Sequence, residues 1–258
     1  MSEGAVHLQV QGGVASVVFD RPQARNAMTW AMYESLARIC EQLQGDASVR
    51  VVRFRGAGGE AFVAGTDIAQ FQSFSSGDDG VAYEQRIDAC ISLLENLPMP
   101  TVAVLEGWAI GGGLAIATAC DFRLATPGTQ VGVPIARTLG NCLSMANVAR
   151  LVAAFGRPRV ERLLLLAELL PAEEALACGW LLQVVPPAGL DAATDALCGR
   201  LASLAPVTQR VSKAALNRLL HRSLPGAEDL IRACYGSDDF HEGVRAFVDK
   251  RKPSWTGR

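Results

Sequence analysis

Histidine and charged residues are both scarce in this 258-residue sequence. It has three histidines and seven cysteines, and no two cysteines form a CxxC pair. A zinc site built from cysteine and histidine ligands is therefore not expected, and we predict no metal. Lys and Arg total 24 against 26 Asp and Glu, a formal net charge of -2. A nucleic-acid partner, which requires a basic surface, is not expected either.

Long apolar runs are also missing. One stretch without Asp, Glu, Lys or Arg covers residues 107–120, and the longest, residues 175–190, has 16 residues, fewer than the roughly 20 apolar residues of a membrane span. No membrane association is predicted, and the N-terminus shows no basic segment followed by an apolar one, so no secretion signal is expected. Most of the cysteines lie among Ala, Leu and Ile, as small buried hydrophobic residues do. A reducing, cytoplasmic location is the prediction.

The distribution of apolar residues predicts an α/β fold. Short apolar runs between glycines and prolines predict strands at 7–10, 14–19, 49–55, 101–105 and 122–125. Helical spacing of apolar residues predicts helices between these strands. From residue 143 onward the pattern is helical, with helices expected at 143–155, 160–170, 172–178, 190–204, 207–221 and 240–250. Strands alternating with helices, followed by helices alone, indicate an α/β core with a helical C-terminal appendage.

Two glycine-containing turns are the strongest candidates for a site, because P-loop, GxGxxG, GxSxG and HExxH motifs are all absent. One turn covers residues 61–68, and the other covers residues 107–113 and leads into a helix. A glycine run before a helix leaves free backbone N–H groups, where an oxyanion is stabilised. One donor from each turn could hold a developing enolate oxygen. Close packing of the backbone is the alternative reason for such a run.

Six motifs in order resemble the crotonase superfamily, the enoyl-CoA hydratase/isomerase family, over essentially the full length. They are FDRP with RNAM at 19–28, AGTDI at 64–68, the glycines at 107–113, ACDFR at 119–123, the segment 172–185, and the tail 237–253. The resemblance implies a crotonase-type ββα spiral core with a C-terminal helical trimerisation region. Residues 1–195 would form the core, and residues 196–258 the oligomerisation region of a homotrimer or a dimer of trimers.

The same resemblance implies an acyl-CoA substrate, with coenzyme A as part of that substrate and no permanently bound cofactor. The backbone N–H groups of Thr66 and Gly112 would form the oxyanion hole. Because these donors belong to the main chain, a threonine where the family often has Ala or Ser leaves this role intact. Asp67, in the same turn, is interpreted as a turn or N-cap residue.

Six further positions match residues of the family that contact CoA. Four of them match the lining of the adenine and phosphate pocket: Ala24, Arg25, Ala64 and Ile68. Phe247 and Lys250 match a segment that approaches CoA on a neighbouring subunit.

Two departures from the family pattern bear on the reaction. Hydratases of the family use two glutamates, which together activate a water molecule and deliver a proton to the α-carbon. The corresponding positions in this sequence are Ala115 and Ile135, and neither side chain can transfer a proton. Hydration by the usual route is therefore not expected.

Other residues could replace the missing acids. Glu84 and Asp88 lie one turn apart on a predicted helix that flanks the acyl pocket in similar proteins, although a solvated helix face is the simpler interpretation. Asn141 lies in a divergent segment that would form a wall of the pocket. Its alternative role is a loop hydrogen bond, or a helix N-cap at Asn141 or Ser144.

Two functions follow from these observations. The first is an acyl-CoA lyase or isomerase of fatty acid metabolism, nominally an enoyl-CoA hydratase, that stabilises a thioester enolate with its proton-transfer group in an unusual place. The second is an acyl-CoA-binding oligomer that does not catalyse a reaction. A proton-transfer group beside the acyl chain would favour the first, and an entirely apolar pocket would favour the second.

Overall fold

Two β-sheets form the centre of the protein, in a computed structural model that describes residues 3–224 and 226–257. The larger sheet has the strand order β1-β2-β3-β5-β7-β10, with β1 (Ala5–Gln11), β2 (Val14–Asp20), β3 (Val51–Gly56), β5 (Thr101–Leu105), β7 (Phe122–Ala125) and β10 (Gln183–Val184). The smaller sheet has the order β4-β6-β8-β9, with β4 (Ala61–Val63), β6 (Trp108–Ile110), β8 (Gln130–Gly132) and β9 (Leu169–Pro171).

The pairing of the strands follows from the connections between them. β1 and β2 form an antiparallel hairpin in which Gln11 pairs with Val14, so Gly12 and Gly13 make the predicted tight turn. The remaining neighbours in the larger sheet are parallel. Parallel strands need crossover connections, which are usually helices. All residues of β5 are buried, as the apolar run predicts for a strand covered on both faces.

The middle of the chain repeats a strand–strand–helix unit. Each unit adds one strand to each sheet and then a helix: β3, β4 and α2 (Gly77–Glu95), then β5, β6 and α3 (Gly112–Ala119), then β7, β8 and the short α4 (Ile135–Thr138). The predicted ββα spiral is therefore confirmed. Before it lie η1 (Pro22–Ala24) and α1 (Trp30–Gln44), and η2 (Ile68–Ser73) leads into α2.

Helices make up most of the second half, with one correction to the expected pattern. The helix predicted at 160–170 is wrong at its end, because Leu169–Pro171 form β9. Ala167 has a φ of +52°, which ends the helix, and Leu169 then pairs with Gly132 of β8. The helices of this half are α5 (Met145–Phe155), α6 (Arg157–Leu165), α7 (Ala172–Ala177), α8 (Pro187–Ser203), α9 (Pro206–Leu220), α10 (Glu228–Tyr235) and α11 (Asp238–Val248).

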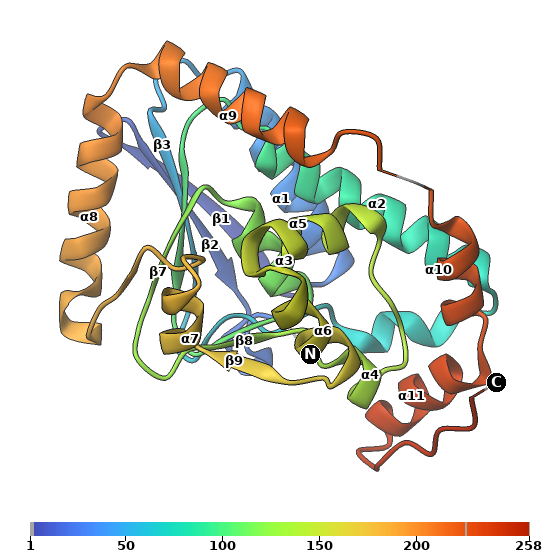
Figure 1. Ribbon diagram of the computed structural model, residues 1–258. Coiled ribbons are helices and arrows are strands. Elements are labelled where there is room, and N and C mark those ends of the chain that lie inside the picture. Colours follow the sequence, from blue (N-terminus) through green and yellow to red (C-terminus); the bar gives the residue numbers. More distant parts are fainter. Residues whose placement is uncertain (1–2, 225, 258) are drawn as a thin grey trace.

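Apolar side chains cover both faces of the larger sheet. On one face α8 packs against β3, β5 and β7, where Leu190 joins Val51 and Val104 in a small cluster. On the other face the large core includes Leu36 of α1 and Phe54 of β3. Figure 1 shows α8 and α9 along two sides of the protein and α10 and α11 at the end away from α8. The predicted boundary at residue 195 falls inside α8. Among the described residues, no helix is long and apolar enough to cross a membrane.

Candidate active site

The two glycine-containing turns lie beside each other at the start of α3. Gly65 has a φ of +97° and Gly111 a φ of +53°, conformations that glycine adopts without strain. Gly65 O accepts from Met28 N at 2.8 Å, and Gly111 N donates to Gly132 O at 2.9 Å. The next residue in each turn, Thr66 or Gly112, has a backbone N–H that donates to no acceptor within the described residues. Two free donors therefore lie in adjacent turns, as an oxyanion hole requires.

The glycine run also allows close packing of the backbone. A Cβ atom at Gly113 would collide with the backbone carbonyl of Val63 in β4. Gly112 is restricted differently, because a Cβ there would lie 2.5 Å from the Tyr33 hydroxyl. Both interpretations of this motif therefore hold at neighbouring residues, because Gly113 allows close packing and Gly112 has a free N–H group.

Both turns line a cavity of about 100 Å³. Its walls come from η2, α2, the start of α3 and the segment 134–147, and the lining residues are Ala64, Gly65, Thr66, Ile68, Phe71, Tyr83, Glu84, Ile87, Ile110, Gly111, Gly112, Ala115, Pro134, Ile135, Thr138, Leu139, Asn141, Leu143 and Asn147. Ala115 and Ile135, at the positions of the family glutamates, both face this cavity. Most of the lining is apolar, with a few polar groups among it, as in small-molecule sites.

Three hydroxyl groups adjoin the free N–H groups, and we call Tyr33, Thr66 and Tyr83 the hydroxyl triad. Thr66 Oγ1 lies 2.9 Å from the Tyr33 hydroxyl and 2.9 Å from the Tyr83 hydroxyl. Tyr33 comes from α1 and Tyr83 from α2. Neither tyrosine carries a local sequence signal, because their approach depends on how α1 and α2 pack around the turn.

Glu84 is the only carboxylate among the described residues that line the cavity. It shares a face of α2 with Ile87 and Ile91, and this apolar face holds its side chain in the interior, 3% exposed. Glu84 Oε1 accepts from the Tyr235 hydroxyl at 2.7 Å, and Oε2 accepts from Ser144 N at 2.9 Å. Burial raises the pKa of Glu84 to about 7, although these two hydrogen bonds oppose the increase.

Asn141 is a second polar group of the cavity lining. Its Nδ2 donates to the Tyr235 hydroxyl at 3.2 Å, and its Oδ1 is buried without a hydrogen-bond partner among the described residues. The helix N-cap is Ser144, whose hydroxyl accepts from Asn147 N at 3.2 Å, so of the two N-cap candidates the structure selects Ser144.

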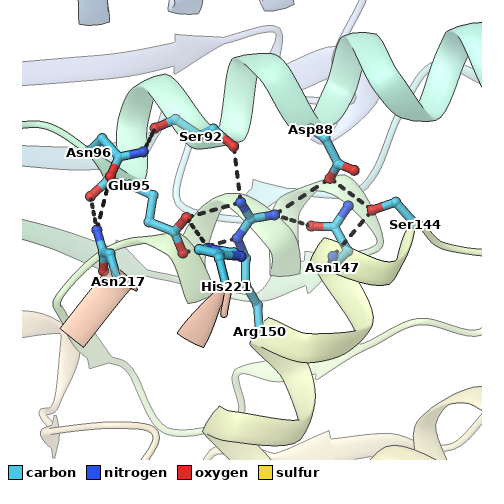
Figure 2. Close-up of polar contacts among 9 residues, drawn as sticks. All are labelled: Asp88, Ser92, Glu95, Asn96, Ser144, Asn147, Arg150, Asn217 and His221. Carbon is cyan, nitrogen blue, oxygen red and sulfur yellow. Dashed lines mark hydrogen bonds and ion pairs between the residues drawn. The ribbon is translucent and has the colours of Figure 1, made fainter. Parts of the chain in front are cut away.

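Asp88 lies outside the cavity lining and belongs to a buried polar network (Figure 2). Asp88 Oδ1 accepts from the Ser144 hydroxyl at 2.8 Å and lies 3.5 Å from Arg150 Nη1. Arg150 also makes two hydrogen bonds of 3.0 Å to the carboxylate of Glu95, which contacts His221 Nε2 at 2.7 Å. The network connects α2, α5 and the end of α9, and no local sequence pattern predicts it.

The residues expected to contact CoA fall into two groups. Ala64 and Ile68 line the cavity. Arg25 O accepts from Ala64 N at 3.0 Å, so η1, which includes Ala24, lies next to the part of the cavity wall that Ala64 forms. The other two residues, Phe247 and Lys250, lie at the end of α11 and do not line the cavity of their own chain. The Phe247 side chain is 51% exposed.

Comparisons with known proteins cover nearly the whole chain. A family model described as enoyl-CoA hydratase/isomerase matches residues 9–258. The chain is 30% identical over 251 residues to the short-chain-enoyl-CoA hydratase of Clostridium acetobutylicum, covering 96% of this chain and 95% of the relative. A crystal structure of an enoyl-CoA hydratase from Mycobacterium avium subsp. paratuberculosis is 31% identical with a TM-score of 0.84, covering 97% of this chain and 98% of that one. Methylmalonyl-CoA decarboxylase complexed with 2S-carboxypropyl-CoA is 26% identical with a TM-score of 0.89, covering 100% of both chains.

Proposed function

The chain belongs to the enoyl-CoA hydratase/isomerase family of the crotonase superfamily, and from this premise we propose that it is an enzyme that forms and stabilises the enolate of an acyl-CoA thioester. The observation that supports this proposal is the position of Glu84 on the cavity that Thr66 and Gly112 also line. An enolate needs a group that moves a proton and donors that hold the developing negative charge. All three residues face the same small space.

Glu84 serves as the proton-transfer group in this proposal. Its carboxylate takes a proton from the α-carbon, and the electron pair of the broken C–H bond moves to the thioester oxygen. The N–H groups of Thr66 and Gly112 donate to that oxygen while it carries the charge. Return of the proton to the α-carbon or to a conjugated carbon completes the reaction. A pKa of about 7 suits a group that both accepts and returns a proton near neutral pH.

Isomerisation or decarboxylation fits the cavity better than hydration. Ala115 and Ile135 provide no second carboxylate to hold a water molecule. Isomerisation needs one group that moves a proton from one carbon to another, and decarboxylation needs none until the enolate is protonated. Relatives of this chain are named as hydratases, and the similar solved structures include methylmalonyl-CoA decarboxylase.

CoA binding is proposed for the wall beside η1, with Ala24, Arg25, Ala64 and Ile68 contacting the nucleotide part. A backbone hydrogen bond from Ala64 N to Arg25 O connects Ala64 with Ala24 and Arg25. In this proposal Phe247 and Lys250 contact CoA bound to a neighbouring subunit, which agrees with their absence from the cavity lining of their own chain.

A homotrimer or a dimer of trimers is proposed, with residues 196–258 as the oligomerisation region. Several apolar side chains of α9 are exposed in the single chain, among them Val207, Val211 and Leu219. Exposed apolar surface of this kind marks protein–protein contacts. Light scattering coupled to size-exclusion chromatography measures the assembly directly, and a monomer at micromolar concentration would contradict this part of the proposal.

Exchange of α-carbon protons with deuterated solvent tests the proposed chemistry. A panel of acyl-CoA thioesters is incubated with the wild type and followed by mass spectrometry, alongside calorimetry for binding. We expect exchange with at least one thioester, and a decrease of about 10²–10⁴-fold in Glu84→Gln. Glu41→Gln is the matched control, because Glu41 is exposed on α1, and it should exchange at the wild-type rate.

The alternative function predicts a different result. A wild type that binds acyl-CoA with no exchange for any thioester would favour the non-catalytic binding protein. Full exchange in Glu84→Gln would instead place the proton transfer on another residue.

A further inference from the structure

The hydroxyl triad has one more proton than the hydrogen bonds between its members require. Each of the three hydroxyls carries one proton and can accept two hydrogen bonds. Two of the three protons are used in the bonds that join Thr66 Oγ1 to Tyr33 and to Tyr83. No other hydrogen bond of these hydroxyls is formed within the described residues, so one O–H has no acceptor in the protein.

That proton remains in place at neutral pH. Burial raises the pKa of Tyr33 and of Tyr83, so both tyrosines stay protonated and act as donors rather than bases. Both hydrogen bonds of the triad are part-buried at the cavity wall, so the unused O–H is open to a ligand that supplies an acceptor.

The triad lies at the oxyanion site. Thr66 and Tyr83 both line the cavity, and a Cβ atom at Gly112 would lie 2.5 Å from the Tyr33 hydroxyl and 3.4 Å from Thr66 Oγ1. The spare O–H is thus held near the two free N–H groups. A thioester oxygen bound by those N–H groups would therefore lie where it can accept a hydrogen bond from this O–H.

We propose that the Thr66 hydroxyl is a third hydrogen-bond donor to the thioester oxygen, in addition to the N–H groups of Thr66 and Gly112. Tyr33 and Tyr83 both donate to Thr66 Oγ1, which fills its two acceptor positions and directs its own proton into the cavity. This inference rests on the proposed function, because it requires an acyl-CoA thioester in the cavity.

The central position of Thr66 selects it over the tyrosines. When both tyrosines donate to Thr66, its hydroxyl accepts two hydrogen bonds, whereas a tyrosine that carried the spare proton would accept only one. Donors that accept hydrogen bonds themselves are polarised and become stronger donors. Removal of one donor from an oxyanion hole slows catalysis by about 10²–10³-fold, which sets the expected size of the effect.

The test combines a spectroscopic measurement with turnover. The infrared carbonyl band of [1-¹³C]butyryl-CoA is compared free and bound to the wild type, Thr66→Val and Thr66→Ser. Thr66→Val keeps the backbone N–H and the side-chain shape but loses the hydroxyl, whereas Thr66→Ser keeps both donors. We expect a lowered carbonyl frequency with the wild type and Thr66→Ser, and a smaller decrease with Thr66→Val. The α-proton exchange rate should fall by about 10²-fold in Thr66→Val, and by much less in Thr66→Ser, which keeps the hydroxyl.

The outcomes separate this inference from the proposed function. If the wild type does not bind butyryl-CoA or any other thioester, the proposed function fails, and this inference fails with it. If thioesters bind but Thr66→Val gives the wild-type carbonyl frequency, the inference alone is overturned. A larger effect in Tyr83→Phe or Tyr33→Phe than in Thr66→Val would also overturn it, since the spare proton would then belong to a tyrosine.

A second variant covers the case in which Thr66→Val does not fold. Thr66→Val leaves two buried tyrosine hydroxyls without partners, whereas the triple variant that adds Tyr33→Phe and Tyr83→Phe leaves none. The triple variant should bind butyryl-CoA with the same weakened polarisation of its carbonyl. A carbonyl frequency equal to that of the wild type would overturn the inference.

Discussion

The hydroxyl of Tyr33 occupies the space beside Gly112 that a side chain there would need. A Cβ atom at Gly112 would lie 2.5 Å from the hydroxyl oxygen but 3.8 Å from the ring carbon that carries it. The first distance is a collision and the second is an ordinary van der Waals contact. The hydroxyl of one residue therefore makes glycine necessary at the other.

This relationship predicts a compensating pair of substitutions. Gly112→Ala alone should decrease the free energy of unfolding by about 1–3 kcal/mol, the usual cost of overpacking. In a Tyr33→Phe background the same substitution should cost much less, because the colliding oxygen is gone. Urea unfolding of the four proteins of this cycle measures the coupling. Equal costs in the two backgrounds would show that another contact restricts Gly112.

The pKa of Glu84 predicts how stability depends on pH. Its pKa is about 7 in the folded protein and 4.5 as the unperturbed value. Between these values the folded state holds a proton that the unfolded state has lost, so Glu84 lowers stability as pH rises through this window. A shift of this size corresponds to about 3 kcal/mol above pH 7. Below pH 4.5 both states are protonated, and the effect disappears.

Glu84→Gln removes this titration, so the difference in stability between this variant and the wild type measures the contribution of Glu84. The difference in free energy of unfolding between Glu84→Gln and the wild type should move in favour of the variant by about 3 kcal/mol from pH 4.5 to pH 8. Other titrating groups cancel in this difference. A difference that does not change with pH would mean that Glu84 titrates alike in both states.

Much of the architecture could be predicted from the sequence. The sequence predicts that the glycine turn of the charge-free stretch 107–120 leads into a helix, and this stretch forms β6, the glycine turn and α3. The resemblance to the crotonase superfamily gave the ββα spiral core, in agreement with the similar solved structures. These predictions succeeded because they depend on local patterns and on motifs in a specific order.

The smaller sheet and the contacts of the cavity could not be predicted. β4, β6, β8 and β9 have three residues each, too few to show an alternating pattern, and β9 was hidden in an apparently helical run. Tyr33 and Tyr83 meet at Thr66 only through the packing of α1 and α2, and residues far apart in sequence give no local signal of such contact. The burial of Glu84 follows from its place on the apolar face of α2, a signal that was present beside Ile87 and Ile91.

The buried network of Arg150 predicts a large loss of stability on substitution. Arg150 and Glu95 are both almost fully buried, so Arg150→Met leaves the charge of Glu95 without its main partner. Breaking a buried ion pair in this way costs about 3–5 kcal/mol. Thermal or urea unfolding measures the change, and Arg157→Met should leave stability nearly unchanged, because Arg157 and Glu161 are exposed.

A second substitution separates charge from packing in this network. Glu95→Gln in the Arg150→Met background removes the unpaired charge and should restore part of the lost stability. Burial acts to raise the pKa of Glu95, but the hydrogen bonds from Arg150 and His221 outweigh it and hold the pKa below 4.5. In the wild type this contribution is present above pH 4.5 and is lost as the pH falls further. No recovery in the double variant would assign the loss to packing of the Arg150 side chain.

Hydration of crotonyl-CoA should be negligible. The reaction adds a hydroxyl group to the β-carbon and a proton to the α-carbon, so it needs groups that deprotonate a water molecule and protonate the enolate. Ala115 and Ile135 can do neither, so Glu84 has no second carboxylate in the cavity lining to share the two tasks. Loss of the conjugated thioester absorbance measures hydration, and adding an authentic hydratase to the same sample is the positive control. Turnover that is present in the wild type and abolished in Glu84→Gln would contradict this prediction, because it would mean that Glu84 activates water without a second carboxylate.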